Sequence, residues 1–167
     1  MLSYLFSSIG FLAVLMLQYG IFSRWTLLSG SADLVMLYII ALCLISNLKY
    51  LWLLVLIFAT ILGAVSAMPF FIIVAFYFCI YLFAQQIRKR IMQSSLLSMY
   101  LLTFLATLAW HAINVALLFI KRVPFNFQTA LFEIMLPSLL LNILISILIH
   151  SIVIESNRLL TPKGVQL

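Results

Sequence analysis

The stretch Gln85-Gln86-Ile87-Arg88-Lys89-Arg90-Ile91-Met92-Gln93 concentrates positive charge between two long apolar runs. Three of the nine Lys and Arg residues of the chain are consecutive here, namely Arg88, Lys89 and Arg90. Such a cluster does not enter hydrocarbon, and basic residues in short loops mark the cytoplasmic side of a membrane. We therefore interpret these three residues as a cytoplasmic anchor in a loop, which sets the direction of the segments on either side.

The composition places the remaining chain in lipid. Hydrophobic residues make up 67% of the 167 positions and charged residues 7%, with a mean hydropathy of +1.32, whereas soluble domains have about a quarter charged residues. The net charge of +6 comes from cations at the ends of apolar runs, a pattern that indicates contact with the lipid bilayer and no nucleic-acid partner. We predict an all-α integral membrane protein with a single polytopic domain over 1–167.

The apolar runs predict a six-transmembrane-helix bundle, because charged, turn-forming or helix-breaking residues separate six of them. Crossing about 30 Å of hydrocarbon takes about 20 helical residues. The second run is shorter than this, so it has to be thin, tilted or continuous with the preceding turn. The predicted spans are 2–22, 34–46, 51–67, 70–84, 96–120 and 131–154.

The distribution of Lys and Arg predicts which side each terminus faces. With the 85–93 stretch in the cytoplasm, six spans place both termini on that side. The inside then carries six cations and the outside three, in agreement with the positive-inside rule. The six are Lys49, Arg88, Lys89, Arg90, Arg158 and Lys163, and the three are Arg24, Lys121 and Arg122. We therefore predict an N-in/C-in multi-pass protein.

Two predicted spans carry polar residues at helical spacing. The stripes are Thr103, Thr107, His111 and Asn114 in one span and Ser138, Asn142, Ser146 and His150 in the other. Residues three and four apart share a helix face, so two antiparallel helices can set these stripes against each other. We expect the pairs His111 with Asn142, Thr107 with Ser146, and Thr103 with His150. The stripes either hold the helices together, at about 0.6 kcal/mol for each hydrogen bond, or line a pocket for a substrate or a proton. Because neither stripe contains an acid, we favour the first.

Small residues and an acid mark two further positions. Ala59, Gly63 and Ala67 form a small-xxx-small series that lets another backbone approach closely. The neighbour is either internal or a helix of a partner protein. Asp33 follows Ser29-Gly30-Ser31 and precedes an apolar run, so we expect it to cap a helix N-terminus.

The sequence contains no GxSxG, HExxH or Gly-rich phosphate-binding motif, and no pair of acids at helical spacing. Cys43 and Cys79 lie inside apolar runs without the spacing of metal ligands or of a redox pair. We therefore expect a protein that is not an enzyme and has no cofactor or metal.

Two short stretches, Ser29-Gly30-Ser31-Ala32-Asp33-Leu34-Val35 and Leu136-Pro137-Ser138-Leu139-Leu140-Leu141-Asn142, carry a resemblance to a known family. The first is similar to the small-residue and Asp-Leu entry to the second span of MreD, the rod shape-determining membrane protein. The second resembles the Leu-Leu-Asn pattern of that family's last helix. Length, span count, orientation and a short basic tail also agree, so the resemblance covers the whole chain. One departure is that many members have an acid after the third-span glycine, whereas Gly63-Ala64-Val65-Ser66-Ala67 has none.

The resemblance implies a scaffold of the bacterial cell-elongation complex, which builds peptidoglycan along the side wall, in the cytoplasmic (inner) membrane. The expected partners are an MreC-like membrane-anchored protein, RodA with its class B penicillin-binding transpeptidase, and indirectly the MreB cytoskeleton. The family is also similar in helix count to the substrate-binding subunits of energy-coupling-factor transporters. The alternative function is therefore uptake of a vitamin-type small molecule, with its pocket near His111 and Asn142.

Overall fold

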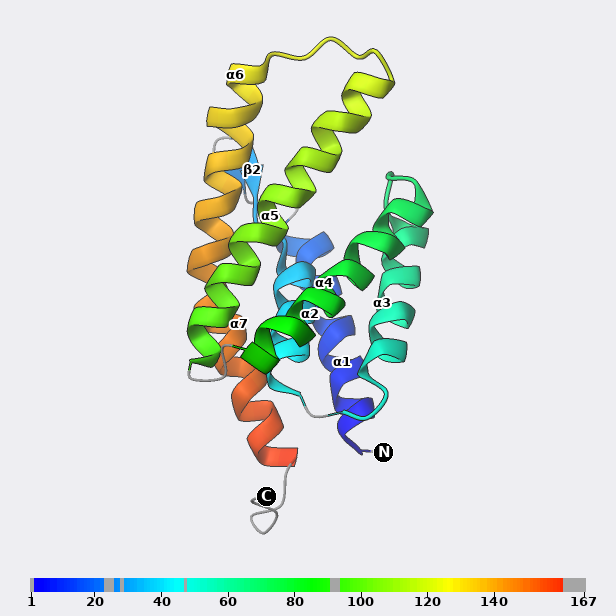
Figure 1. Ribbon diagram of the computed structural model, residues 1–167, viewed down its shortest axis with the longest axis vertical. Helices are drawn as coiled ribbons and strands as arrows, with labels where there is room; N and C mark the ends of the chain where they lie inside the picture. The colour runs from blue at the N-terminus through cyan, green and yellow to red at the C-terminus, as the bar shows by residue number, and fades with distance from the viewer. Residues whose placement is uncertain (1, 23–25, 28, 47, 91–93, 161–167) are drawn as a thin grey trace.

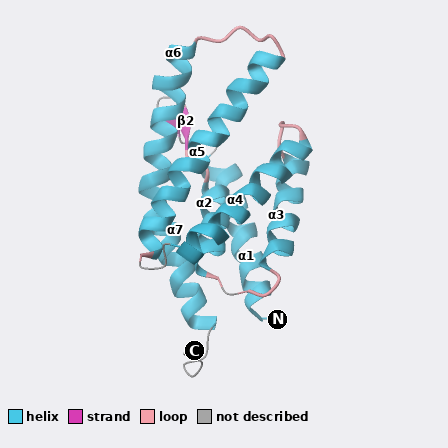
Figure 2. Cartoon of the chain, in the orientation of Figure 1, coloured by secondary structure: helices cyan, strands magenta, loops and turns pink. Residues whose placement is uncertain are grey.

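The structure is a computed structural model, and it describes residues 2–22, 26–27, 29–46, 48–90 and 94–160. These residues are almost entirely helical (Figure 2). The elements are α1 (Leu2–Leu17), a π-helical turn η1 (Gln18–Phe22), β1 (Thr26–Leu27), β2 (Gly30–Ser31), α2 (Leu34–Ile45), α3 (Leu51–Val65), α4 (Phe70–Arg90), α5 (Ser95–Ile120), the short α6 (Phe127–Thr129), a second π-helical segment η2 (Ala130–Met135), and α7 (Leu136–Leu160).

Four helical segments are long and apolar enough to cross a membrane. They cover Ser3–Gly20, Phe70–Lys89, Ser95–Ile120 and Phe127–Leu159, while α2 and α3 are shorter apolar helices. The start of α1 and the end of α7 lie at the same end of the molecule (Figure 1). The predicted all-α membrane fold is therefore confirmed, with four segments of spanning length among the residues described.

The helix boundaries differ from the predicted spans, because the prediction ends a span wherever polar residues begin. The prediction placed Arg88–Arg90 in a loop, but α4 continues through Arg90. In the same way, the helical segment predicted as 131–154 starts at Phe127 and ends at Leu160. A helix satisfies its backbone hydrogen bonds internally in water as well as in lipid, so a change of solvent at the membrane surface need not end it.

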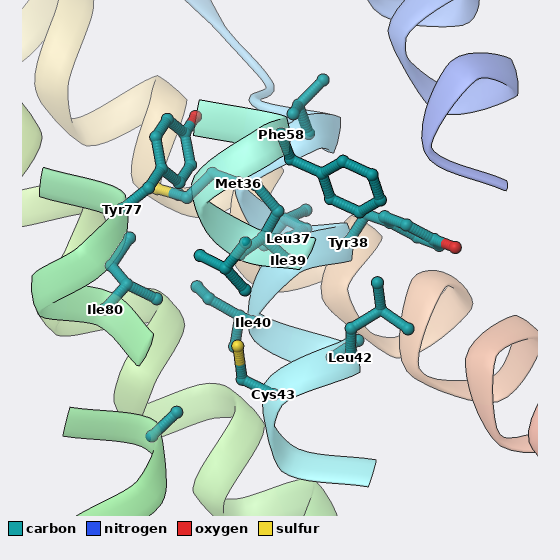
Figure 3. Close-up of a cluster of buried hydrophobic side chains, with 14 of the residues drawn as sticks. Met36, Leu37, Tyr38, Ile39, Ile40, Leu42, Cys43, Phe58, Tyr77 and Ile80 are labelled. Atoms are coloured by element: carbon teal, nitrogen blue, oxygen red, sulfur yellow. The ribbon is translucent and has the colours of Figure 1, made fainter. Parts of the chain in front are cut away.

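Helix α2 forms the centre of the molecule. Eleven of its twelve residues are buried, from Leu34 to Leu44, and α1, α4, α5 and α7 all contact it. Figure 3 shows its side chains in one cluster with Phe58 of α3 and with Tyr77 and Ile80 of α4. Because the surrounding helices cover it on all sides, α2 is hydrophobic all round and does not need an amphipathic pattern.

A tight packing contact joins α3 to α4, and it involves part of the small-residue series. Ala59 and Gly63 are buried. A Cβ atom added at Gly63 would lie 2.6 Å from the Phe70 ring of α4. Ala67 lies beyond the end of α3 and is exposed. The predicted groove is therefore filled from inside the molecule at Gly63, and Ala67 is not part of it.

Candidate functional site

The strands β1 and β2 form a small antiparallel hairpin that packs on the start of α7 (Figures 1 and 2). Pro137 has no N–H group, so the Glu133 carbonyl four residues earlier lacks its α-helical donor. The Ser29 N–H donates to this carbonyl at 3.1 Å. A Cβ atom added at Gly30 would lie 2.6 Å from the Ser138 backbone nitrogen and 2.8 Å from the Ile134 carbonyl oxygen. Only glycine therefore lets the hairpin backbone lie directly on α7.

Two side chains of α7 continue this contact toward the start of α2. The Ser31 N–H donates to Ser138 Oγ at 3.1 Å, and the Asp33 N–H donates to Asn142 Oδ1 at 2.8 Å. The amide of Asn142 then donates to Thr107 Oγ1 of α5 at 3.0 Å. Asn142 is 2% exposed, so it links three segments of the chain within the protein interior.

Gln18, at the start of η1, holds the other side of the same backbone. Its amide donates to the Ala32 carbonyl at 3.0 Å, and its carbonyl oxygen accepts from the Leu34 N–H at 2.7 Å. Irregular backbone at membrane depth requires protein partners, because lipid offers none. The side chains of Gln18, Ser138 and Asn142 supply them. Sequence reasoning missed Gln18, although it is the one amide side chain in the first apolar run.

Asp33 occupies the N-cap position of α2, as the sequence suggests, with its carboxylate accepting from the Met36 N–H at 3.0 Å. It also lines a half-open cavity of about 260 Å³, which we call the Asp33 cavity. The walls of this cavity come from η1, β2 and helices α2 to α5. They are formed by Gln18, Tyr19, Ser31, Asp33, Val35, Leu62, Ser66, Ile73, Tyr77 and Trp110.

The polar stripes of α5 and α7 meet in a different register from the one expected. Asn142 contacts Thr107, whereas the prediction placed Ser146 there. This shift of one helical turn places Ser146 level with Thr103. The Ser146 hydroxyl donates to the Ile143 carbonyl of its own helix. Thr103 Oγ1 is buried and has no hydrogen-bond partner among the residues that the structure describes. This register places Ser138 level with His111, but Ser138 accepts from the Ser31 N–H of β2 instead.

The ends of the two stripes lie apart. His150 Nε2 lies 3.0 Å from Ser95 Oγ, so it is not paired with Thr103. Asn114 donates to the Trp110 carbonyl of its own helix at 2.8 Å. Figure 1 shows α5 and α7 diverging toward the connection at 121–126. His111 is half-buried and does not line the Asp33 cavity.

An open apolar groove of about 320 Å³ runs along α1 between α2 and α7, and we call it the α1–α7 groove. Its walls are mainly apolar side chains, such as Phe6, Ala13 and Ile149. Ser46 lines it at the end of α2, where the guanidinium of Arg88 donates to the Ser46 carbonyl at 2.7 Å. Arg88 therefore caps α2 from inside the protein, in addition to the anchoring role predicted for it.

These features define a class of protein: an all-α membrane protein with a buried central helix, which follows a hairpin packed on η2 and α7. Within the ranges that the structure describes, no three His, Cys, Asp or Glu side chains lie close enough together to hold a metal ion. Comparisons of the chain with models of protein families, with curated proteins and with solved structures find no match.

Proposed function

We propose that this protein is a membrane scaffold of the bacterial cell-elongation complex, as its resemblance to the MreD family implies. In this proposal the chain crosses the cytoplasmic membrane six times with both termini inside. It binds the transmembrane helix of an MreC-like protein and, with it, RodA and its class B penicillin-binding transpeptidase. Contact with the MreB cytoskeleton is indirect.

The observation that carries the proposal is that the two stretches with the resemblance contact each other. They are about 100 residues apart in the chain. Yet Ser31 is bonded to Ser138 and Asp33 to Asn142, and Gly30 lies against Pro137. Two chance matches would have no reason to form one interface. A shared family signature is expected to do so, because the residues that hold a fold together are constrained as a group.

The α1–α7 groove supports a scaffold in a second way. It is apolar and open, and exposed apolar side chains of α1, such as Phe6 and Ile9, line it. Helices associate in lipid through close packing and not through burial alone. The groove along the exposed helix α1 is therefore a place where a partner helix can pack closely.

Co-purification from solubilised bacterial membranes tests the proposal. A tagged protein should retain an MreC-like protein and the RodA–transpeptidase pair. Ala13→Trp, which fills the α1–α7 groove, should reduce this recovery at least about threefold while the purified variant keeps its melting temperature. Met16→Trp is the matched control, because Met16 is 72% exposed and does not line the groove. If wild-type protein retains none of these partners under gentle solubilisation, the scaffold function is wrong.

The Asp33 cavity favours a second candidate, a substrate-binding subunit for small-molecule uptake. The cavity lies between helices, and seven of its ten lining residues are polar or aromatic with a polar group, which suits a bound ligand. Accumulation of a labelled small molecule in vesicles that contain this protein and an energising module would favour uptake over a scaffold.

A further inference from the structure

The Asp33 cavity combines a carboxylate with three aromatic rings. Tyr19 comes from η1, Tyr77 from α4 and Trp110 from α5, and all three line the same space as Asp33. Figure 3 shows the Tyr77 hydroxyl at the edge of the apolar cluster, directed away from Ile80. A carboxyl group and three aromatic side chains therefore line one small volume.

This charge has no cationic partner among the residues described. The ion pair that the described residues form joins Arg158 to Glu155, near the end of α7. The Met36 N–H and the positive end of α2 stabilise the Asp33 carboxylate in part, because a helix N-terminus carries about half an elementary charge. Ionisable groups within a membrane protein are costly and are normally paired. The cavity beside Asp33 leaves room for a cationic partner of this carboxylate.

We propose that the Asp33 cavity binds a small organic cation, either a quaternary ammonium or a protonated amine. The faces of Trp and Tyr attract such cations at about 6 Å or less from the ring centre, and the carboxylate supplies the opposite charge. A volume of about 260 Å³ lies just below the usual range for ligand pockets, which starts near 300 Å³, so the ligand is small. Hard metal ions take six or more oxygen ligands, whereas Val35, Leu62 and Ile73 contribute apolar wall.

Binding is measured on the purified full-length protein in detergent, with choline chloride as the probe. The neutral isostere 3,3-dimethylbutan-1-ol controls for shape, and NaCl at equal ionic strength controls for salt. A ligand that binds only the folded state raises the melting temperature with its concentration. Choline should raise it by about 3 °C or more at saturation, while the isostere and NaCl should leave it within about 1 °C. Radiolabelled choline gives the affinity directly.

Asp33→Asn separates the charge from the helix cap, because Asn caps helices as well as Asp does. The variant should lower choline affinity at least about tenfold. Trp110→Phe, which keeps a ring against Phe76, should lower it by a smaller factor. An equal shift with the isostere or NaCl would overturn the proposal. So would unchanged affinity in Asp33→Asn, or no shift with choline, tetramethylammonium and butylammonium alike. If Asp33→Asn does not fold, the comparison of choline with the neutral isostere on the wild-type protein tests the proposal.

Such a site is independent of the scaffold function. Choline binding is measured on the isolated protein, whereas the scaffold is tested by recovery of partners. A negative result in either experiment does not affect the conclusion from the other.

Discussion

At the scale of single residues, one proline and one glycine explain why a hairpin can lie against a helix inside this protein. Pro137 leaves the Glu133 carbonyl available, and Ser29 occupies it. Gly30 removes the side chain that would otherwise keep the two backbones apart. The free carbonyl beside Pro137 in α7 thus fits the backbone of the hairpin at Gly30, although neither sequence stretch by itself predicts this contact.

Gly30→Ala should destabilise the protein, because the added methyl group meets backbone atoms of Ser138 and Ile134 that cannot rotate away. We expect a loss of about 1–3 kcal/mol, as for other overpacked sites, seen as a lower melting temperature in detergent. Gly20→Ala is the matched control, since a Cβ at Gly20 would meet nothing within 4 Å. Equal melting temperatures for the two variants would mean that the hairpin does not lie on α7 in this way.

Asn142→Leu should be the most damaging change within the polar stripes. It removes the acceptor of the Asp33 N–H and the donor to Thr107, and an unsatisfied buried group costs about 1–3 kcal/mol. Asn114→Leu should cost less than about 1 kcal/mol, because Asn114 bonds only to its own helix at Trp110. Thermal unfolding of both variants in the same detergent provides the measurement, and a reversed order would contradict the role assigned to Asn142.

At the scale of elements, the register of α5 against α7 differs from the one that helical spacing predicts. Helical spacing correctly places Thr103, Thr107, Asn142 and Ser146 at one interface, because all four are buried. It does not give their pairing. Thr107 pairs with Asn142, one turn away from the expected partner. Asn142 also accepts from the Asp33 N–H, and no rule that considers only two helices includes this third segment.

Cysteine pairs distinguish the two registers in a background in which Cys43 and Cys79 are replaced by Ala. Thr103→Cys with Ser146→Cys should crosslink efficiently, because the Thr107–Asn142 hydrogen bond places these positions level. Thr107→Cys with Ser146→Cys should crosslink at least about fivefold less, since they lie one turn, about 5.4 Å, apart along the axis. Gel mobility after mild oxidation reports both yields, and the opposite order would restore the register predicted from spacing alone.

At the scale of the whole molecule, the central position of α2 explains how a helix that is too short to span the membrane can still be part of a crossing. A helix of twelve residues spans about 18 Å, less than the hydrocarbon thickness. The hairpin and Asp33 extend the path of the chain, and their backbone groups are satisfied by Gln18 and α7. A short helix can thus form part of a membrane crossing when the surrounding protein replaces lipid as its solvent.

Reporter fusions test the crossing number and the orientation. Fusions after Lys163 and within 88–93 should report the cytoplasm, and a fusion after Arg122 should report the outside. This pattern follows from six crossings and from the bias of Lys and Arg toward one side. An outside signal at Lys163, or a cytoplasmic signal after Arg122, would exclude the six-span, N-in/C-in arrangement.

The amino-acid sequence alone determined that lipid surrounds the protein, that its fold is helical, and which helix faces point inward. Hydrophobic composition requires lipid, backbone satisfaction in lipid requires helices, and the spacing of Thr107 and Asn142 places them on inward faces. The N-cap role of Asp33 also follows from the local sequence, because a carboxylate directly before an apolar helical run favours the N-cap position. Only the tertiary structure decided the register of α5 and α7, the internal neighbour of Gly63 and the cavity beside Asp33. Each of these depends on segments far apart in the chain, and local patterns do not record where such segments meet.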